Sequence, residues 1–481
     1  MSSTRCLGVA SAADGDLRRG IEAIKREQEL PLQFPADVEA AAASAAAAPC
    51  WPELDRTDIP LVTVDPPGAM DLDQALHVER QGDGFRVYYA IADVAAFVSP
   101  GDAIDQEAHR RGETLYGADA KVPLHPKALS EDAASLLPDQ ERPALLWTMD
   151  LDATGEGTVV DVRRARVRSR ARFDYGSLQA SIDAGTADPV WDVLREIGTL
   201  REQREALRGG ISLPLPEQEM DECDGRWTLT YRARHAVEDW NEQISLLTGM
   251  AAAHLMLQAR VGLLRTLPAP QDWMIERLRR TAKALQIEWP KNAIYQDFIR
   301  SLDPTDPKAI AMMVACTSLL RGAAYVAFDG ELPEGAAHWA LASEYTHVTA
   351  PLRRLVDRYT GEICLALCAE EPVPGWVMAA LRGLPATMQA SGQRAGRFER
   401  AVIDLAEAIA LSPQVGELFD GSIVDVDRKD PTRGTAMLQA LAIEGPVTSD
   451  APLQAGSALQ LRLAEADVAK RKIRFEPRPA D

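Results

Sequence analysis

The order of apolar and polar positions divides the chain into stretches of strand character and stretches of helical character. From about residue 56 to residue 175, short apolar runs lie between turn signals such as QGDG and ATGEG, a pattern that predicts strands. The predicted strands are PLVTVD, ALHVER, FRVYYAIADVAAFV, WTMDLDA and TVVDVRRARVRSRARF. We therefore expect a β-rich core in this part of the chain.

Helical spacing replaces this pattern in the middle of the chain. Strands followed by helices are typical of an α+β domain with a mixed sheet, which is the fold class that we predict. Apolar residues three and four positions apart predict helices over 190–208, 236–262, 272–286, 307–327 and 351–370, and helical character continues through 374–411.

The last part of the chain returns to short strands. Between about residues 414 and 478, strand-like segments such as GELFDGSIVDVD and RGTAMLQALAIEG are separated by Gly, Pro and Asp. Five short strands in this length predict a five-stranded OB barrel, a fold that commonly binds oligonucleotides.

Two helices are predicted near the start of the chain, DLRRGIEAIKREQEL and PADVEAAAASAAAA, joined by the short breaker PLQF. Asp16 suits an N-cap, and Pro35 suits a first helical turn. The pair resembles a helix-turn-helix unit that could read nucleic acid, but two short helices in sequence also serve to pack against or cap a larger domain. Both interpretations stay open.

Composition narrows the class of protein. A length of 481 residues suggests roughly two to four domains, and 46% hydrophobic with 26% charged residues is typical of soluble globular proteins. No apolar run approaches the ~20 residues of a membrane span, and no secretory signal is visible, so we expect a cytoplasmic protein. The six cysteines are scattered and are expected to be reduced core residues, because Cys364 and Cys368 lack a second pair of zinc ligands nearby.

The formal charge of −20 argues against a polyanion ligand, because nucleic-acid affinity comes mostly from Lys and Arg. The distribution of charge argues differently, because the segment RRARVRSRAR carries six arginines: Arg163, Arg164, Arg166, Arg168, Arg170 and Arg172. Either these arginines form a local basic wall, or they belong to a solvated strand face that neighbouring acids balance.

Three aspartates are crowded into residues 63–76, TVDPPGAMDLDQAL: Asp65, Asp71 and Asp73. PLVTV reads as a strand and PPG as a turn, and an extended AMDLDQAL would put Asp71 and Asp73 on one face. Converging carboxylates repel one another by about 4 kcal/mol per pair at ~4 Å in an effective dielectric of ~20, unless a cation lies among them. Hard oxygen ligands without nearby His or Cys favour Mg²⁺, with Mn²⁺ as the alternative.

Two other interpretations of these aspartates are open. Asp near Pro-Gly is a frequent turn former, so the segment could be an acidic surface loop. DLDQA could also be the aspartyl nucleophile loop of a haloacid-dehalogenase-like phosphatase, but Ala75 stands where that D-x-D-x-[TV] pattern needs Thr or Val.

A second stretch, YTHVTAPLRRLVDRY at 345–359, favours the metal-site interpretation of the aspartates. It contains Tyr345 and Thr349, and it predicts a helix that starts at Pro351 with Arg353 and Arg354 in its first turn. Guanidinium groups bind phosphate in a bidentate manner, and a helix N-terminus adds a favourable dipole. Acids suited to a metal and arginines suited to phosphate together predict phosphodiester hydrolysis.

These two stretches resemble the ribonuclease II family, whose catalytic domain carries D-x-x-x-x-x-D-x-D-D near its start and a TSPIRRY-x-D-like segment near its end. The segments between them, YYAIADVAAFVSPGDAIDQEAHRRGETLYG and VPLHPKALSEDAASLLP, also look like family segments in the same order. The likeness runs from about Leu61 to Cys368, and the tail is similar to the family's terminal OB fold.

The resemblance implies four parts along the chain: a helical, helix-turn-helix-like region at 1–55, an RNB catalytic domain at 56–372, a helical connector at 373–412, and an OB fold of the ribosomal protein S-one type at 413–481. The region at 1–55 does not look like the paired cold-shock domains of longer family members, so RNA would reach the catalytic channel differently here.

Carried over by matching positions, the resemblance makes Asp65, Asp71 and Asp73 the catalytic acids that bind Mg²⁺ (or Mn²⁺), and Arg353 the arginine at the scissile phosphate. Gln74 departs from the pattern, because it occupies the position of a fourth aspartate. A glutamine carbonyl can still ligate Mg²⁺ or orient a water, so we expect reduced or altered metal dependence and not inactivity.

The resemblance also implies RNA contacts. Tyr116 matches an aromatic that stacks on nucleotides near the 3′ end, Tyr175 matches a tyrosine in the channel, and Arg354 would lie alongside as a backbone contact. The family's second stacking ring is missing, since the aligned position is Leu213. A glutamate that contacts ribose matches Glu242 in NEQISLLTGMAAA, or Asn241 in the other register.

The implied activity is processive 3′-to-5′ hydrolysis of single-stranded RNA to nucleoside 5′-monophosphates by a hydrolase acting in RNA turnover, with no obligate protein partner. A competing class is a catalytically impaired RNA-binding protein that keeps the same scaffold. Gln74 favours this second class, whereas Asp65, Asp71, Asp73 and Arg353 favour the enzyme.

Overall fold

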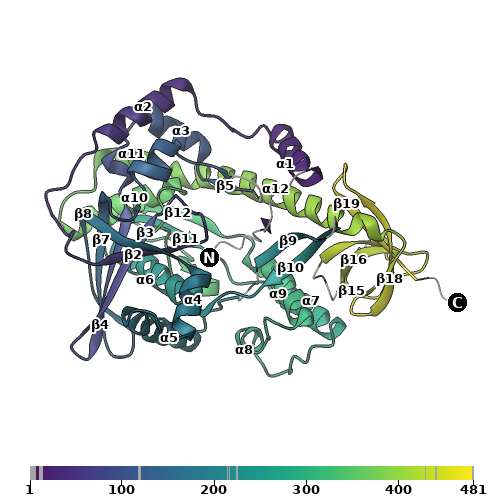
Figure 1. The fold of residues 1–481 in the computed structure, drawn as a ribbon. Coiled ribbons are helices and arrows are strands. Elements are labelled where there is room, and N and C mark those ends of the chain that lie inside the picture. Colours follow the sequence, from purple (N-terminus) through teal and green to yellow (C-terminus); the bar gives the residue numbers. More distant parts are fainter. Residues whose placement is uncertain are drawn as a thin grey trace.

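Two closed β-barrels joined by helices make up the molecule (Figure 1). The mixed α+β class and the five-stranded barrel at the end of the chain are confirmed. None of the helices in the described residues combines the length and apolar character that crossing a bilayer needs. The computed structural model describes residues 7–9, 15–117, 121–213, 215, 217–223, 226–427, 429–438, 441 and 443–478.

The first barrel has the strand order β2-β3-β4-β7-β8. Neighbouring strands are antiparallel except that β2 and β8 run parallel, an arrangement that closes the barrel and places Asp65 opposite Asp174. Their bounds are β2, Leu61–Asp65; β3, Gln74–Gln81; β4, Gly84–Ala92; β7, Glu141–Leu151; and β8, Gly157–Asp174.

Alternation of apolar and polar residues builds this barrel. In β4, Val87 and Tyr89 are buried while Arg86 and Tyr88 are half-buried, as expected for successive side chains on opposite faces of a strand. Trp147 in β7 is fully buried in the same core. The sequence prediction for β4 ran to residue 98, but the strand ends at Ala92 and a 3₁₀ turn follows.

Helices surround the first barrel and share its core. In Figure 1, α4 and α5 lie on the lower side of the barrel, while α10 and α11 lie on its upper side. Their bounds are α3, Ala103–Arg111; α4, Tyr175–Asp183; α5, Val190–Arg208; α6, Ala236–Ala259; α10, Leu355–Cys368; and α11, Gly375–Leu381.

The second barrel has the order β15-β16-β17-β19-β18 and forms the yellow end of the molecule (Figure 1). A long helix, α12 (Leu384–Leu411), connects it to the first barrel, and Phe398 and Leu405 of this helix share a core with the barrel's Phe475. The strands are β15, Leu418–Val426; β16, Arg433–Leu438; β17, Ile443–Thr448; β18, Ala458–Asp467; and β19, Lys472–Pro477.

The two N-terminal helices pack on different parts of the molecule (Figure 1). Helix α1 (Asp16–Glu27) lies on α12, so closely that a Cβ on Gly20 would be 2.5 Å from Leu405 Cδ2. Helix α2 (Ala36–Ala47) packs in the core beside the first barrel. Because each helix buries its apolar face against a different neighbour, their arrangement agrees with the packing interpretation and not with a compact helix-turn-helix reader.

The remaining elements include one correction to the predicted helix over 307–327. Only its first half is helical, and the chain then turns into β12, whose AYVAFD sequence is rich in β-branched and aromatic residues. The bounds are β1, Leu7–Val9; β5, Leu115–Tyr116; β6, Lys121–Val122; β9, Glu217–Cys223; β10, Arg226–Arg232; β11, Val261–Thr266; α7, Asp272–Ala284; α8, Tyr295–Arg300; α9, Pro307–Cys316; β12, Ala324–Asp329; β13, Ala337–His338; and β14, Ser343–Glu344.

Candidate active site

The three aspartates lie where β2 ends and before β3 begins. Asp65 is the last residue of β2, and Asp71 and Asp73 belong to the loop that leads into β3. The prediction that AMDLDQAL extends as one strand is wrong for its first half, because β3 starts only at Gln74. This acidic loop, residues 66–73, is fixed by a hydrogen bond from a distant segment, since Ser135 Oγ accepts the Leu72 N–H at 2.9 Å.

The segment 345–354 meets this loop, although some 280 residues separate the two in sequence. The Leu352 N–H donates to Asp73 Oδ1 at 2.7 Å, and Arg353 Nε lies 3.4 Å from Asp73 Oδ2. Gln74 Nε2 donates to the Thr349 carbonyl. The structure therefore brings together the two stretches that sequence analysis singled out separately.

Helix α10 begins four residues later than the sequence predicted. It starts at Leu355, so Arg354 is its extended N-cap residue and Pro351 lies in the preceding turn. The cause is Asp357, whose buried carboxylate accepts the Ala350 N–H at 2.7 Å and binds the Arg354 guanidinium at 2.6 Å. These bonds hold the chain in a turn and leave the Leu352 N–H free for Asp73.

A glycine allows the segment to lie close to α6. A Cβ on Gly249 would collide with the ring of Tyr345 and lie 2.5 Å from the Thr346 carbonyl oxygen. At this close approach the Thr346 N–H donates to the Gly249 carbonyl at 3.2 Å. One turn earlier on the helix, Ser245 Oγ and Thr349 Oγ1 are 2.8 Å apart. Helix α6 thus fixes the position of the segment that carries Arg353.

Two of the three carboxyl groups titrate near neutral pH. Burial raises the pKa of Asp73 to about 8 and that of Asp65 to about 7. The positive charge of Arg353 opposes this rise at both groups, whereas the negative charge of Asp71 adds to it. Asp73 is only 4% exposed, so water stabilises its ionised form poorly.

Asp71 has a partner that sequence analysis missed. Lys121 Nζ lies 2.7 Å from Asp71 Oδ1 and 3.0 Å from Glu131 Oε1, so the ammonium group bridges two carboxylates. No periodicity or motif links residue 121 to residue 71, and the contact arises only because β6 folds back beside the acidic loop. Lys121 therefore places a positive charge directly beside Asp71.

Two of the predicted RNA contacts, Tyr116 and Tyr175, lie near residues of this centre. The Tyr116 side chain is 46% exposed and its hydroxyl accepts from Arg353. Tyr175, the first residue of α4, accepts from Asn241 Nδ2 at 3.2 Å. Its proximity to Asp65 contributes to the raised pKa of the Tyr175 hydroxyl, after burial as the main cause.

Two further predicted contacts have internal partners. Glu242 Oε2 lies 2.8 Å from Arg234 Nη2, and Arg354 is bound to Asp357 as described above. Leu213 is 8% exposed and packs in a core with α7, α8 and α9. The roles of Glu242 and Arg354 towards RNA stay predictions.

The arginine-rich strand is largely neutralised. Of the two interpretations, the strand face balanced by acids agrees better with the structure than a free basic wall. The two arginines nearest the end of β8, Arg170 and Arg172, donate to backbone carbonyls. Four others have carboxylate partners: Arg163 with Asp161, Arg164 with Asp93 and Glu362, Arg166 with Asp55, and Arg168 with Glu141.

The acidic loop offers the donor set that a hard divalent cation prefers. Asp65 Oδ2 is buried and has no hydrogen-bond partner, and the side chains of Asp71, Asp73 and Gln74 add only oxygen atoms as ligands. Within the residues that the structure describes, no three or more His, Cys, Asp or Glu side chains are already clustered as a metal site. The chemistry of these donors fits Mg²⁺, and Asp65, with its unpartnered oxygen, carries that fit.

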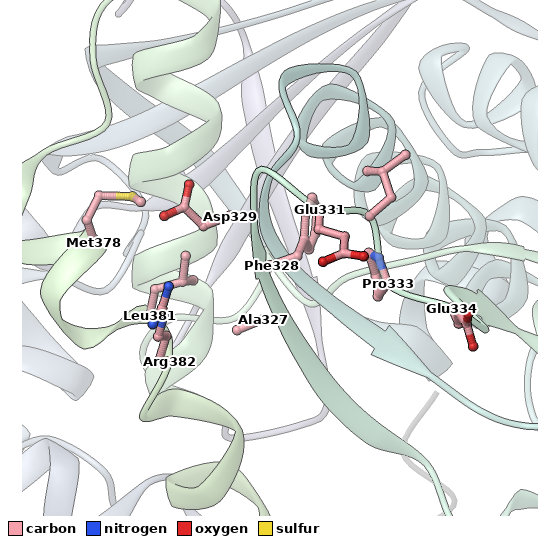
Figure 2. A pocket seen from close by; sticks show the side chains of 10 residues that line it. Ala327, Phe328, Asp329, Glu331, Pro333, Glu334, Met378, Leu381 and Arg382 are labelled. Atoms are coloured by element: carbon pink, nitrogen blue, oxygen red, sulfur yellow. The ribbon is translucent and has the colours of Figure 1, made fainter.

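A pocket elsewhere is separate from this centre. It has a volume of about 430 Å³ and lies between the end of β12 and α11, where Figure 2 shows Asp329 and Phe328 facing Met378, Leu381 and Arg382. No residue of the acidic loop or of the segment 345–354 lines it.

Comparisons with known proteins cover most of the chain. Residues 54–368 match the model for the RNB domain, and residues 417–478 match the model for the RNase II-type exonuclease C-terminal S1 domain. The chain is 30% identical over 334 residues to Exosome complex exonuclease RRP44 homolog A of Arabidopsis thaliana, which covers 65% of this chain and 35% of the relative. It thus spans about a third of the length of that relative.

Solved structures share the fold. RNase R of Mycoplasma genitalium in complex with ribose-methylated single-stranded RNA gives a TM-score of 0.82 at 19% identity, over 97% of this chain and 79% of the other. Yeast Ssd1, described as a pseudonuclease, gives a TM-score of 0.68 at 16% identity, over 90% of this chain and 55% of the other. At such identities the likeness shows the fold alone.

Proposed function

Because the chain belongs to the RNB-domain family of 3′-to-5′ exoribonucleases, we propose that it hydrolyses single-stranded RNA from the 3′ end, processively and with Mg²⁺, to nucleoside 5′-monophosphates. The observation that carries this proposal is the meeting of Asp73 with the Leu352 N–H and Arg353. That contact joins acids suited to a cation with a guanidinium suited to a phosphate.

Each part of the site has a role in this reaction. Asp65, Asp71 and Asp73 are the residues that would hold Mg²⁺ (or Mn²⁺), which when bound supplies Lewis-acid activation of water and neutralises developing negative charge. Arg353, whose side chain is 42% exposed beside Asp73, binds the scissile phosphate and stabilises charge that develops on it. Its neighbour Arg354 stays with Asp357 and keeps the segment in place.

Nucleotides near the 3′ end would stack on Tyr116. Its exposed ring lies beside Arg353, and stacking on one aromatic ring stabilises a bound base by roughly 1–3 kcal/mol without reading sequence. The RNA complex of the M. genitalium RNase R, which has the same fold, supports RNA as the ligand. The second barrel is of a type that binds oligonucleotides, which also supports this choice.

A second candidate function is RNA binding without hydrolysis. The observation in its favour is that Gln74 stands at the fourth acidic position and its amide is bound to the Thr349 carbonyl. Ssd1 shows that this fold can occur in a pseudonuclease. We favour the enzyme, because the half-buried Asp65 and the buried Asp73 lie beside Arg353, an arrangement that binding alone does not need.

The direction of hydrolysis tests the proposal. Two copies of one single-stranded RNA are prepared, one labelled at the 5′ end and one in the last phosphodiester at the 3′ end. With Mg²⁺ and the purified chain, the second copy should release labelled mononucleotide at once, while the first keeps its label until only a short oligonucleotide is left. Early release of the 5′ label, or internal fragments, would contradict the proposal.

A further inference from the structure

A second cavity has a volume of about 630 Å³. Pockets that bind small molecules commonly have volumes of ~300–1,000 Å³. It opens between α5, α6 and the hairpin formed by β7 and β8, and neither the acidic loop nor the segment 345–354 lines it. Residues from all three elements line it, among them Met149, Val160, Arg201, Arg204, Met250 and Leu257.

One wall of the cavity is apolar. Leu247, Met250 and Leu257 come from one side of α6, and Met149 and Val160 come from the two strands of the hairpin. Methionine adapts its shape to a partner and makes favourable contacts with aromatic rings. This wall suits a flat apolar group.

The other wall carries three arginines. Arg201, Arg204 and Arg208 are three and four residues apart on α5, so they project from one face of the helix. Arg204 is paired with Glu156, and Arg208 Nη2 lies 4.0 Å from Glu205. These two arginines therefore have carboxylates beside them.

Arg201 differs from its neighbours. It is 4% exposed and donates from Nη1 to the Gly155 carbonyl at 2.9 Å, but its Nε is buried without a hydrogen-bond partner. Across the described chain no carboxylate forms an ion pair with it. Burial and the charge of Arg208 lower the pKa of the Arg201 guanidinium to about 10, although the negative charge of Glu205 opposes this decrease. A buried cation of this kind is unfavourable unless an anion approaches it.

We propose that this cavity binds a phosphorylated small molecule with a flat apolar body, and that a nucleoside monophosphate has the matching chemistry. The phosphate would lie against Arg201 and its arginine neighbours, since guanidinium groups bind phosphate oxygens in pairs. The base would lie on the wall that contains Met250. The choice of a nucleotide rests on the proposed function, because that reaction releases such molecules, but binding itself needs no hydrolysis.

The cavity is connected to the active site through α6. Asn241 and Ser245 of this helix contact the active site, and residues from Leu247 to Leu257 line the cavity. At 1.5 Å per residue the lining residues begin about 3 Å along the helix axis from Ser245 and extend about 15 Å further. Because neither the acidic loop nor the segment 345–354 lines the cavity, a ligand there would bind at a second site and not at the reacting phosphate.

Calorimetric titration of the full chain with AMP, in EDTA so that no metal-dependent phosphate site contributes, tests the proposal. The native chain should bind AMP more tightly than it binds inorganic phosphate or adenosine. Equal affinity for inorganic phosphate would overturn the role of the apolar wall, and no binding of AMP would overturn the proposal itself. Because hydrolysis is not measured, the result is independent of whether the chain degrades RNA.

Variants locate the site. Ala251→Phe fills the cavity from α6 and keeps every charge, and it should abolish AMP binding. Arg204→Ala should weaken binding by about tenfold, the loss expected for one hydrogen bond to a charged group. Arg195→Ala is the matched control, because Arg195 lies on the same helix, is half exposed and pairs with Asp192 at 2.6 Å outside the cavity.

Thermal unfolding of each variant shows that it folds. If Ala251→Phe lowers the unfolding temperature, Val160→Phe fills the cavity from the β7–β8 hairpin and replaces it as the test variant. AMP affinity that is unchanged in a folded cavity-filling variant would overturn the proposal. Affinity that falls equally in Arg195→Ala would also overturn it, because the effect would then come from surface charge.

Discussion

Asp73 is the residue on which the two halves of the active site converge. Its carboxyl group accepts a backbone N–H from Leu352, lies beside Arg353 and is almost completely buried. A buried carboxyl group retains its proton at neutral pH unless a positive charge compensates for the lost hydration. Arg353 supplies part of this compensation, and a divalent cation would supply the rest.

The raised pKa values predict that Mg²⁺ affinity depends on pH. Asp65 and Asp73, with pKa values of about 7 and about 8, must lose protons to ligate a cation. Affinity should therefore rise by at least about tenfold between pH 6 and pH 7, and level off above pH 8. Calorimetry in two buffers of different ionisation enthalpy counts the protons released, and a pH-independent affinity without proton release would contradict the prediction.

The same two groups affect folding in a defined direction. Both pKa values lie above the ~3.9 of an aspartate in an unfolded chain, so the folded state holds protons that the unfolded state has lost. Their stabilising contribution is therefore greatest below about pH 4. It decreases as the pH rises towards 8 and is constant above that value.

Gln74 predicts an altered metal dependence. In the native chain its amide binds the Thr349 carbonyl, which a carboxylate could not do. Gln74→Asp should move the Mg²⁺ activation curve of RNA hydrolysis to lower concentrations, because it adds an anionic ligand, and should destabilise the fold by about 1 kcal/mol through the lost hydrogen bond. Gln74→Ala is the control that removes the amide without adding charge. Identical activation curves for the native chain and Gln74→Asp would disprove the idea.

At the scale of elements, the segment 345–354 shows what periodicity could and could not predict. The sequence predicted a helix from Pro351 because proline favours the first turn, and the helix over 355–368 was correct. Its true start at Leu355 depends on hydrogen bonds from Asp357 to Ala350 and Arg354, which no local pattern reveals. In the same way, the strand β12 inside a predicted helix depends on pairing with β11.

The network around Asp357 predicts a large loss of stability when it is broken. Asp357→Ala leaves the half-buried Arg354 without its carboxylate, which should lower the free energy of unfolding by about 3–5 kcal/mol. It should also slow RNA hydrolysis by about 100-fold, because Arg353 loses its position. Denaturant unfolding and single-turnover hydrolysis measure the two effects.

A matched control for this variant lies on the surface. Asp297 and Arg300 have the same spacing of three residues, but Asp297 is 65% exposed and the two groups are 3.4 Å apart. Asp297→Ala should cost less than about 1 kcal/mol and leave hydrolysis unchanged. Comparable losses in both variants would mean that the Asp357 network has no special role.

At the scale of the whole molecule, the resemblance to the ribonuclease II family is confirmed, as is the five-stranded barrel at the end of the chain. Both were predictable because motifs and strand spacing are local features of the sequence. The closure of the first barrel by parallel pairing of β2 with β8 was not predicted, since it joins strands about 100 residues apart. The contact between Lys121 and Asp71 was not predicted either, because the two residues are 50 positions apart in the sequence.

The position of the N-terminal helices also required the structure. Leu17, Ile21 and Ile24 are fully buried, which the sequence pattern allows, but their partner is α12, nearly 400 residues later. Charge gives a similar lesson, because the sequence left open whether the arginines of β8 form a basic wall or are balanced by acids, and only the structure located their carboxylate partners. The packing of the N-terminal helices and the charge balance of β8 both depend on contacts between segments that are distant in the sequence.

The most direct test of the account compares the native chain with Asp73→Asn on a 5′-labelled single-stranded RNA in Mg²⁺, with products separated by length over time and binding followed on a native gel. The native chain should accumulate a short end product without intermediates, whereas the variant should bind the RNA with similar affinity and leave it intact, with hydrolysis reduced by at least about 100-fold. RNA that both proteins retard but neither degrades would contradict the account and would show that this scaffold binds RNA without hydrolysing it.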